Sequence, residues 1–178
     1  TSTVGGIPVN RLVYIIGYPA SGKTTAVRSA LDTLNSQLIA EPFKHMVYGD
    51  TVTQLGYDRE TYGGTDALAF NVQPKVIEWL SACTTPLLIG EGDRLANDAF
   101  FTAVQKQGWE LTIAHIKVKE LVALKRMTQR GSDFNPAWVR RTMTKVDNLA
   151  ARWNVVTING NLKTNYVAEQ VKELLYAG

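Results

Sequence analysis

One short segment near the start of the chain, residues 17–24, constrains the fold more than any other feature. It reads Gly-Tyr-Pro-Ala-Ser-Gly-Lys-Thr, which matches the pattern GxxxxGK[ST]. The apolar residues 11–16 before it predict a buried strand, and residues 24–34 after it predict a helix. Because this pattern binds phosphate groups when it joins a strand to a helix, we expect an α/β domain that binds a nucleotide.

The residue types in this phosphate loop (residues 17–24) suit polyphosphate binding. Gly17 and Gly22 allow backbone angles and a close approach that a Cβ atom would block. Lys23 supplies a positive charge for the β and γ oxygens, and the Thr24 hydroxyl can ligate Mg²⁺. We therefore predict ATP and Mg²⁺ as ligands. The expected nucleotide contacts are Gly17, Ala20, Ser21, Gly22, Lys23, Thr24 and Thr25.

Strand-like and helix-like segments alternate along the rest of the chain. We expect strands at residues 45–48, 86–89, 111–118 and 155–158, and helices at residues 73–82, 95–107, 121–130, 136–152 and from Asn161 onward. This alternation favours one α/β P-loop domain, residues 1–178, with a five-stranded parallel sheet and helices on both faces. Residues 49–65 show no regular pattern, and a long irregular segment inside a compact domain is usually functional.

Composition narrows the setting in which such a domain works. The formal net charge of +3 permits an anionic substrate, including nucleic acid, without requiring one. No apolar run approaches the roughly 20 residues that a membrane-spanning helix needs. Cys83 is the single cysteine, and the first ten residues do not resemble a signal peptide. We therefore expect a cytoplasmic protein with no membrane partner and no obligate protein partner.

A second acidic site follows the predicted strand at residues 86–89. Residues 87–93 read LLIGEGD, and a strand that ends in carboxylates beside the phosphate-loop strand is expected in phosphate-transferring P-loop proteins. Glu91 or Asp93 would hold the metal ion or orient an acceptor hydroxyl, and Arg94 would contact an acceptor phosphate. The alternative is a polar turn in which Asp93 caps the next helix.

Basic residues gather in a predicted helical lid, residues 126–141. Arg126 and Arg130 are four residues apart and share a helix face, and Gly131 then interrupts the helix. Arginines of this kind neutralise charge on a migrating phosphoryl group. Arg140 and Arg141 are neighbours that point apart, so we expect one of them, Arg141, to reach the site. The alternative is a solvated basic helix face.

The acceptor segment, residues 55–68, lies beyond the predicted strand at residues 45–48. Tyr48, Tyr57 and Tyr62 are candidates for stacking on a base, and Arg59 for pairing with a phosphate. Asp50 or Asp66 would accept the proton of the acceptor hydroxyl. The alternative is a structured surface loop in which Asp66 caps a helix.

Four motifs together resemble a known group of proteins. The phosphate loop, LGxxR followed by GGTDAL, EGDRL and RxxxRG occur in this order between residues 11 and 161. They resemble small P-loop kinases of tailed phages, which are adenylate- or thymidylate-kinase-like. That group includes kinases proposed to phosphorylate 5-hydroxymethyluracil in phage DNA. The lid is also similar to that of polynucleotide and gluconate kinases.

The resemblance implies a nucleoside-kinase-like fold and assigns several roles. Lys23 and Thr24 become nucleotide and metal contacts, and Arg126 and Arg130 become lid arginines. The acceptor-site residues that it implies are Arg59, Thr65 and Asp66. It leaves the general base open among Asp50, Asp66, Glu91 and Asp93.

The sequence thus predicts an enzyme that transfers the γ-phosphoryl group of ATP to a hydroxyl. The resemblance favours the 5-hydroxymethyl group of 5-hydroxymethyluracil in DNA as the acceptor. The alternatives are a kinase for a free nucleoside or nucleotide and a P-loop ATPase without a small-molecule acceptor. We expect adenine near residues 159–161, which follow the last predicted strand.

Overall fold

The computed structural model describes residues 3–4, 7–8, 10–31, 35–57, 63–131 and 135–176. The strands are β1 (Thr3–Val4), β2 (Ile7–Pro8), β3 (Arg11–Gly17), β4 (Ser36–Ile39), β5 (His45–Tyr48), β6 (Val52–Leu55), β7 (Leu87–Glu91), β8 (Glu110–Lys117) and β9 (Val155–Asn159). The helices are α1 (Lys23–Leu31), the short η1 (Thr65–Ala67), α2 (Gln73–Ala82), α3 (Asp98–Lys106), α4 (Glu120–Gln129), α5 (Pro136–Arg152) and α6 (Thr164–Tyr176).

The main sheet, in the part of the chain that is described, has seven strands in the order β4-β5-β6-β7-β3-β8-β9. The five strands from β6 to β9 in this order run parallel, as expected of an α/β sheet. The prediction of five parallel strands was wrong because β4 and β6 were not expected, and because β4 and β5 pair antiparallel. β6 lies within residues 49–65, where no regular structure was predicted.

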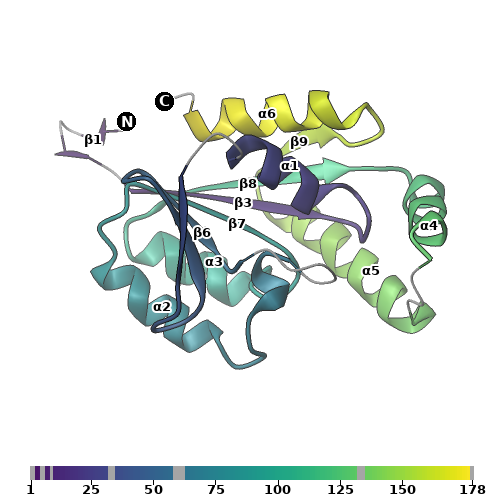
Figure 1. Cartoon of the computed structure of the whole chain (residues 1–178). Helices are drawn as coiled ribbons and strands as arrows, with labels where there is room; N and C mark the ends of the chain where they lie inside the picture. The colour runs from purple at the N-terminus through teal and green to yellow at the C-terminus, as the bar shows by residue number, and fades with distance from the viewer. Residues whose placement is uncertain are drawn as a thin grey trace.

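Helices cover both faces of this sheet (Figure 1). α1 and α6 lie on one face, where they pack on Val13 and Ile15 of β3. α2, α3 and α5 lie on the other, against Leu12, Tyr14 and Ile16. Because β3 is buried on both faces from Leu12 to Ile16, this stretch is a continuous apolar run rather than an alternating one. The prediction of helices on both faces is confirmed.

The predicted strand at residues 45–48 forms, but it runs in the opposite direction to the one expected. Residues 49–51 turn the chain back, so Tyr48 pairs with Val52, and Val52 pairs with Leu87 at the start of β7. Leu87 in turn pairs with Arg11 at the start of β3. The C-terminal end of β5 therefore lies at the amino ends of the parallel strands, whereas the phosphate loop lies at their carboxyl ends.

Local signals explain where several helices begin. α5 begins at Pro136, and the Asn135 side chain accepts hydrogen bonds from the amides of Ala137 and Trp138. α3 begins at Asp98, later than predicted, because the Asn97 side chain caps it by accepting from the Phe100 amide. Among the described helices, none is both long and apolar enough to span a membrane.

Candidate active site

The phosphate loop joins β3 to α1 at the carboxyl end of the parallel strands. Lys23 is the first residue of α1, and its Nζ donates to the carbonyls of Gly17 and Tyr18, both at 2.9 Å. Gly17 is packed so closely that an added Cβ would lie 2.6 Å from Ser21 Oγ. The first amides of α1 have no partner within the helix, so they are available to phosphate oxygens.

Two features of this loop fit a bound polyphosphate. The Ser21 hydroxyl is buried and has no hydrogen-bond partner among the described residues. Gly22 has a φ of 96°, a backbone conformation that favours glycine.

Two further residues of the predicted nucleotide contacts differ from this pattern. Ala20 adopts a φ of 61° without being glycine, which is a strained backbone for a residue with a Cβ. Thr25 lies in the first turn of α1 and is exposed.

Glu91 ends β7 beside the phosphate loop. Its side chain is 2% exposed, and Thr24 Oγ1 donates to Glu91 Oε1 at 3.0 Å. The structure therefore brings together two of the three predicted metal ligands. A hydroxyl and a carboxylate supply the hard oxygen atoms that Mg²⁺ prefers.

Asp93, the third predicted ligand, is paired with a lysine. It lies in the loop between β7 and α3, where Lys145 of α5 forms an ion pair with its Oδ1 at 3.0 Å. Lys145 Nζ also donates to the Asp93 carbonyl at 3.0 Å. This pair holds α5 on the loop and leaves Glu91 as the carboxylate next to Thr24.

Asp66 lies on η1, held by the same β7–α3 loop. Its Oδ1 accepts from the amides of Asp93 and Arg94, at 2.9 and 3.0 Å. Burial raises the pKa of Asp66 above its ordinary value, while the positive charge of Lys23 acts against that shift. Burial likewise lowers the pKa of Lys23, and Glu91 and Asp66 act against that shift.

Thr65 supports Asp66 from inside the core. Its side chain is fully buried, and its Oγ1 donates to the Glu91 carbonyl at 2.9 Å. The buried Tyr14 hydroxyl lies 3.0 Å from Thr65 Oγ1 and donates to the Gly92 carbonyl at 2.9 Å. These contacts tie η1 to the ends of β3 and β7, so Thr65 fixes the position of Asp66.

Gly64, which precedes η1, packs closely against Glu91 and has no room for a side chain. Its φ is 62°, and a Cβ at this position would lie 2.2 Å from Glu91 Oε1. No other side chain fits without displacing the carboxylate beside Thr24. The glycine in the GGTDAL motif is therefore explained by packing against Glu91.

The predicted lid contacts the phosphate loop through Arg126. Arg126 of α4 donates to the Gly160 carbonyl at 3.1 Å and to the Ala20 carbonyl at 3.5 Å. Arg130 follows α4 and is exposed, yet its charge contributes to the lowered pKa of Lys23, after the larger effect of burial. Arg141, on α5, is exposed.

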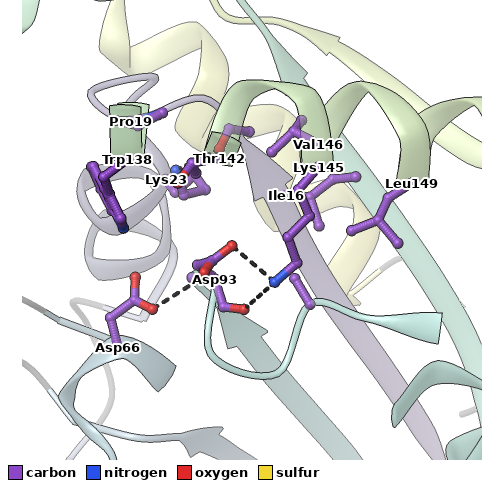
Figure 2. Close-up of a pocket in the computed structure, with 13 residues that line it drawn as sticks. Ile16, Pro19, Lys23, Asp66, Asp93, Trp138, Thr142, Lys145, Val146 and Leu149 are labelled. Atoms are coloured by element: carbon purple, nitrogen blue, oxygen red, sulfur yellow. Dashed lines mark hydrogen bonds and ion pairs between the residues drawn. The ribbon is translucent and has the colours of Figure 1, made fainter. Parts of the chain in front are cut away.

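One cavity joins these parts (Figure 2). Lys23, Asp66 and Asp93 line it from the phosphate loop and the strand ends. α5 lies across from them and contributes Trp138 and Lys145 among its lining residues, with Trp138 on the side of Asp66. The arrangement places the Lys23 cation and the carboxyl groups of Asp66 and Asp93 around one cavity.

Residues 9–173 match the family model described as P-loop Nucleotide Kinase3. The chain belongs to this family. The match confirms the P-loop kinase part of the resemblance seen in the sequence. A search of curated proteins found no match.

Solved structures of small kinases share the fold of this P-loop nucleotide kinase family member. A gluconokinase from Sinorhizobium meliloti 1021 has a TM-score of 0.54 at 12% identity, covering 96% of this chain and 97% of that chain. A sugar kinase from Janibacter sp. HTCC2649 has a TM-score of 0.56 at 14% identity, covering 94% and 95%. A shikimate kinase from Acinetobacter baumannii, in complex with shikimate, has a TM-score of 0.54 at 15% identity, covering 96% and 95%. At such identities the similarity concerns the fold.

Two predicted acceptor residues of this nucleotide kinase family member lie away from the cavity. The Tyr48 hydroxyl is buried and donates to Gln54 Oε1 at 2.9 Å. Asp50 is exposed in the turn between β5 and β6, at the amino ends of the parallel strands and away from the phosphate loop. The structure does not bring either to Lys23, because β5 runs antiparallel to β6. Arg59 and Tyr62 lie outside the described residues.

Trp138, Thr142 and Lys145 line the cavity but were not among the predicted site residues. Their spacing of four and three residues marks one face of a helix. That spacing, on a helix directly after the predicted lid, is the signal that could have identified them. Arg94 was predicted to contact an acceptor phosphate. Its guanidinium group instead donates to the Leu68 carbonyl and stacks over the Phe70 ring.

Proposed function

We propose that this protein transfers the γ-phosphoryl group of ATP to a hydroxyl group of an acceptor, with Asp66 as the general base. The observation that carries the proposal is the cavity shared by Lys23 and Asp66, next to the contact between Thr24 and Glu91. It combines a polyphosphate loop, a metal-ligand pair and a carboxylate of raised pKa within one site.

Asp66 is favoured over the other three carboxylates by its surroundings. Asp50 lies at the far edge of the sheet, and Asp93 is paired with Lys145. Glu91 is almost fully buried and accepts the Thr24 hydroxyl. Asp66 lines the cavity, and a raised pKa makes its carboxylate a stronger base than an exposed aspartate.

In the proposed reaction the acceptor oxygen forms a bond to the γ-phosphorus while the bond from that phosphorus to the β–γ bridging oxygen breaks. Asp66 takes the hydroxyl proton, and ADP leaves with the bridging oxygen. Lys23 and Arg130 balance the charge on the phosphate oxygens, and α5 helps to exclude water from the cavity. Thr24 and Glu91 would hold Mg²⁺, which neutralises phosphate charge when bound.

For the acceptor we propose the hydroxymethyl group of 5-hydroxymethyluracil in DNA, as the resemblance implies. The charge distribution supports a polyanionic acceptor, because residues 117–145 contain eight Lys and Arg but only two Asp and Glu. Trp138 offers an aromatic surface inside the cavity, which suits a nucleobase. A base in a duplex would have to be flipped out or presented in a single strand.

A kinase for a free nucleoside or nucleotide is the second candidate, since the same cavity would accept an isolated base. It predicts transfer without any dependence on a DNA strand and without salt-dependent DNA binding. An ATPase without an acceptor is the third candidate, and it predicts phosphate release that no acceptor alters.

The test is an acceptor screen with ATP labelled at the γ-phosphate. The arms are DNA with 5-hydroxymethyluracil, thymine DNA, free nucleosides and monophosphates, D-gluconate and shikimate. We expect label on the modified DNA alone. Label on a free nucleotide or a polyol would overturn the DNA acceptor but keep the phosphotransferase, and label only in inorganic phosphate would overturn both.

A further inference from the structure

Phe70 is an unusually exposed aromatic side chain four residues after Asp66 in the chain. It lies just after η1 and is 91% exposed, whereas most large hydrophobic side chains of the described chain are buried. The guanidinium carbon of Arg94 lies 4.1 Å from the centroid of its ring. A cation at this distance is attracted to the π face, and most of the ring surface stays open to solvent.

The backbone on both sides of Phe70 is fixed. Leu68 and Val72 are 6% and 4% exposed and belong to the core beneath α2 and α3. The Val72 amide donates to the Ala69 carbonyl at 3.2 Å, and Arg94 donates to the Leu68 carbonyl. The ring therefore stands on an anchored turn, so its exposure is a feature of the fold.

Arg94 links this ring directly to Asp66. Its amide donates to Asp66 Oδ1 at 3.0 Å, while its guanidinium group covers Phe70. A similar pair flanks the other end of the acceptor segment: Lys44 Nζ lies 5.2 Å from the centroid of the Tyr57 ring, and Tyr57 pairs with Gly64. A cation and an aromatic ring thus lie together at each end of the acceptor segment.

We propose that Phe70, backed by Arg94, is a stacking platform for a nucleobase of the acceptor. The base lies on the open face of the ring, and the positive charges of Arg94 and Lys44 favour the phosphates that adjoin it. The proposal rests on the proposed function, because it requires an acceptor hydroxyl at Asp66.

The experiment compares Phe70→Leu, which keeps an apolar side chain without a π face, with Phe70→Tyr, which keeps the ring. Binding of a labelled single-stranded oligonucleotide that contains 5-hydroxymethyluracil is measured by anisotropy without ATP. We expect Kd to rise about 5- to 150-fold for Phe70→Leu and to change little for Phe70→Tyr. In turnover assays, KM for this oligonucleotide should rise for Phe70→Leu. Both kcat and KM for ATP should stay at the wild-type values.

Tyr166→Leu is the matched control, since Tyr166 is a 57% exposed aromatic residue on α6, on the other face of the sheet. It should bind as the wild type does. Equal Kd values for Phe70→Leu and the wild type would overturn the platform even if phosphoryl transfer is observed. Weaker binding by Phe70→Leu in a protein that transfers phosphate to no acceptor would support the platform while refuting the proposed function.

Discussion

The two sides of the cavity are built in different ways. The nucleotide side is a continuous run of chain, in which Lys23 and Thr24 follow Gly17 and Gly22 within one turn between β3 and α1. The acceptor side is assembled from η1, the β7–α3 loop and α5, and the Lys145–Asp93 contact joins residues 52 positions apart. A local motif specifies the first, and long-range packing specifies the second.

A small junction couples the two sides. Glu91 accepts the Thr24 hydroxyl with its side chain and the Thr65 hydroxyl with its carbonyl. Gly64 packs against the Glu91 carboxylate, and the Tyr14 hydroxyl donates a hydrogen bond to the Gly92 carbonyl. The geometry of the acceptor side therefore depends on the strand that ends at Glu91.

The largest expected effect comes from a substitution on the nucleotide side. Lys23→Ala removes the positive charge of the phosphate loop, and we expect ATP turnover to fall about 10³- to 10⁵-fold, by analogy with loss of a catalytic arginine. Steady-state turnover with labelled ATP measures the loss. The fold should persist, because Lys23 contacts only carbonyls of its own loop among its described hydrogen bonds.

Lys172→Ala controls for the loss of one lysine, because Lys172 lies on α6 and pairs only weakly with Glu169. It should turn over ATP at the wild-type rate. Retained turnover in Lys23→Ala, with an unchanged melting temperature, would refute the assignment of the nucleotide side.

The nucleotide side was largely predictable because its signals are local. The pattern at residues 17–24 specifies the turn between β3 and α1. The direction of β5 was not predictable in the same way, because a short turn at residues 49–51 decides whether its end faces the cavity or the opposite edge. That turn reversed the expected positions of Tyr48 and Asp50.

The next effect breaks the acceptor side alone. Asp66→Asn keeps an oxygen that can accept from the Asp93 and Arg94 amides but removes the base. We expect kcat to fall about 10²- to 10⁴-fold, with ATP affinity unchanged. Acceptor-dependent turnover and ATP titration measure the two quantities separately.

The pH dependence gives a second test of Asp66. The base must be ionised to accept a proton, and burial raises its pKa above the ordinary value of 3.8. Activity should therefore fall as the pH drops through that raised pKa, and Asp66→Asn should lack this acidic limb. Asp93→Asn, which loosens the pair with Lys145, should keep the limb. An acidic limb lost only in Asp93→Asn would transfer the role of base to Asp93.

A smaller effect tests the junction between the two sides. Gly64→Ala forces a Cβ to within 2.2 Å of Glu91 Oε1 at a φ of 62°. We expect the free energy of unfolding to fall by about 2–3 kcal/mol, from backbone strain plus displacement of Glu91. Urea denaturation measures the change.

Gly108→Ala isolates the strain, because Gly108 has a φ of 86° and nothing within 4 Å of an added Cβ. It should cost only about 1–2 kcal/mol, and activity should remain. Equal losses in the two variants would show that Gly64 is required for its backbone angle alone and does not couple the two sides.

Residues on α5 show why part of the acceptor side was not predicted. Trp138 and Lys145 are ordinary members of an amphipathic helix, and neither belongs to a local motif. Their role depends on α5 crossing the strand ends, which places Lys145 beside Asp93. A sequence pattern states which helix face is apolar but not which loop that face will meet.

The smallest effect concerns Ala20, where the nucleotide side meets the lid. Its φ of 61° strains a residue with a Cβ, but the side chain packs with Tyr18 and Trp138 on the apolar cluster of α4 and α5. Ala20→Gly relieves about 1–2 kcal/mol of strain. It also adds about 0.4–1 kcal/mol of chain entropy to the unfolded state and removes a methyl group worth about 0.8 kcal/mol when buried.

These terms nearly cancel, so the free energy of unfolding of Ala20→Gly should stay within about 0.8 kcal/mol of the wild type. Urea denaturation of the two proteins side by side measures the difference. A gain well above that value would mean that the methyl group contributes nothing to holding the lid on the phosphate loop. A clear loss would mean that lid packing outweighs backbone strain, and the nucleotide side would then depend on long-range contacts as the acceptor side does.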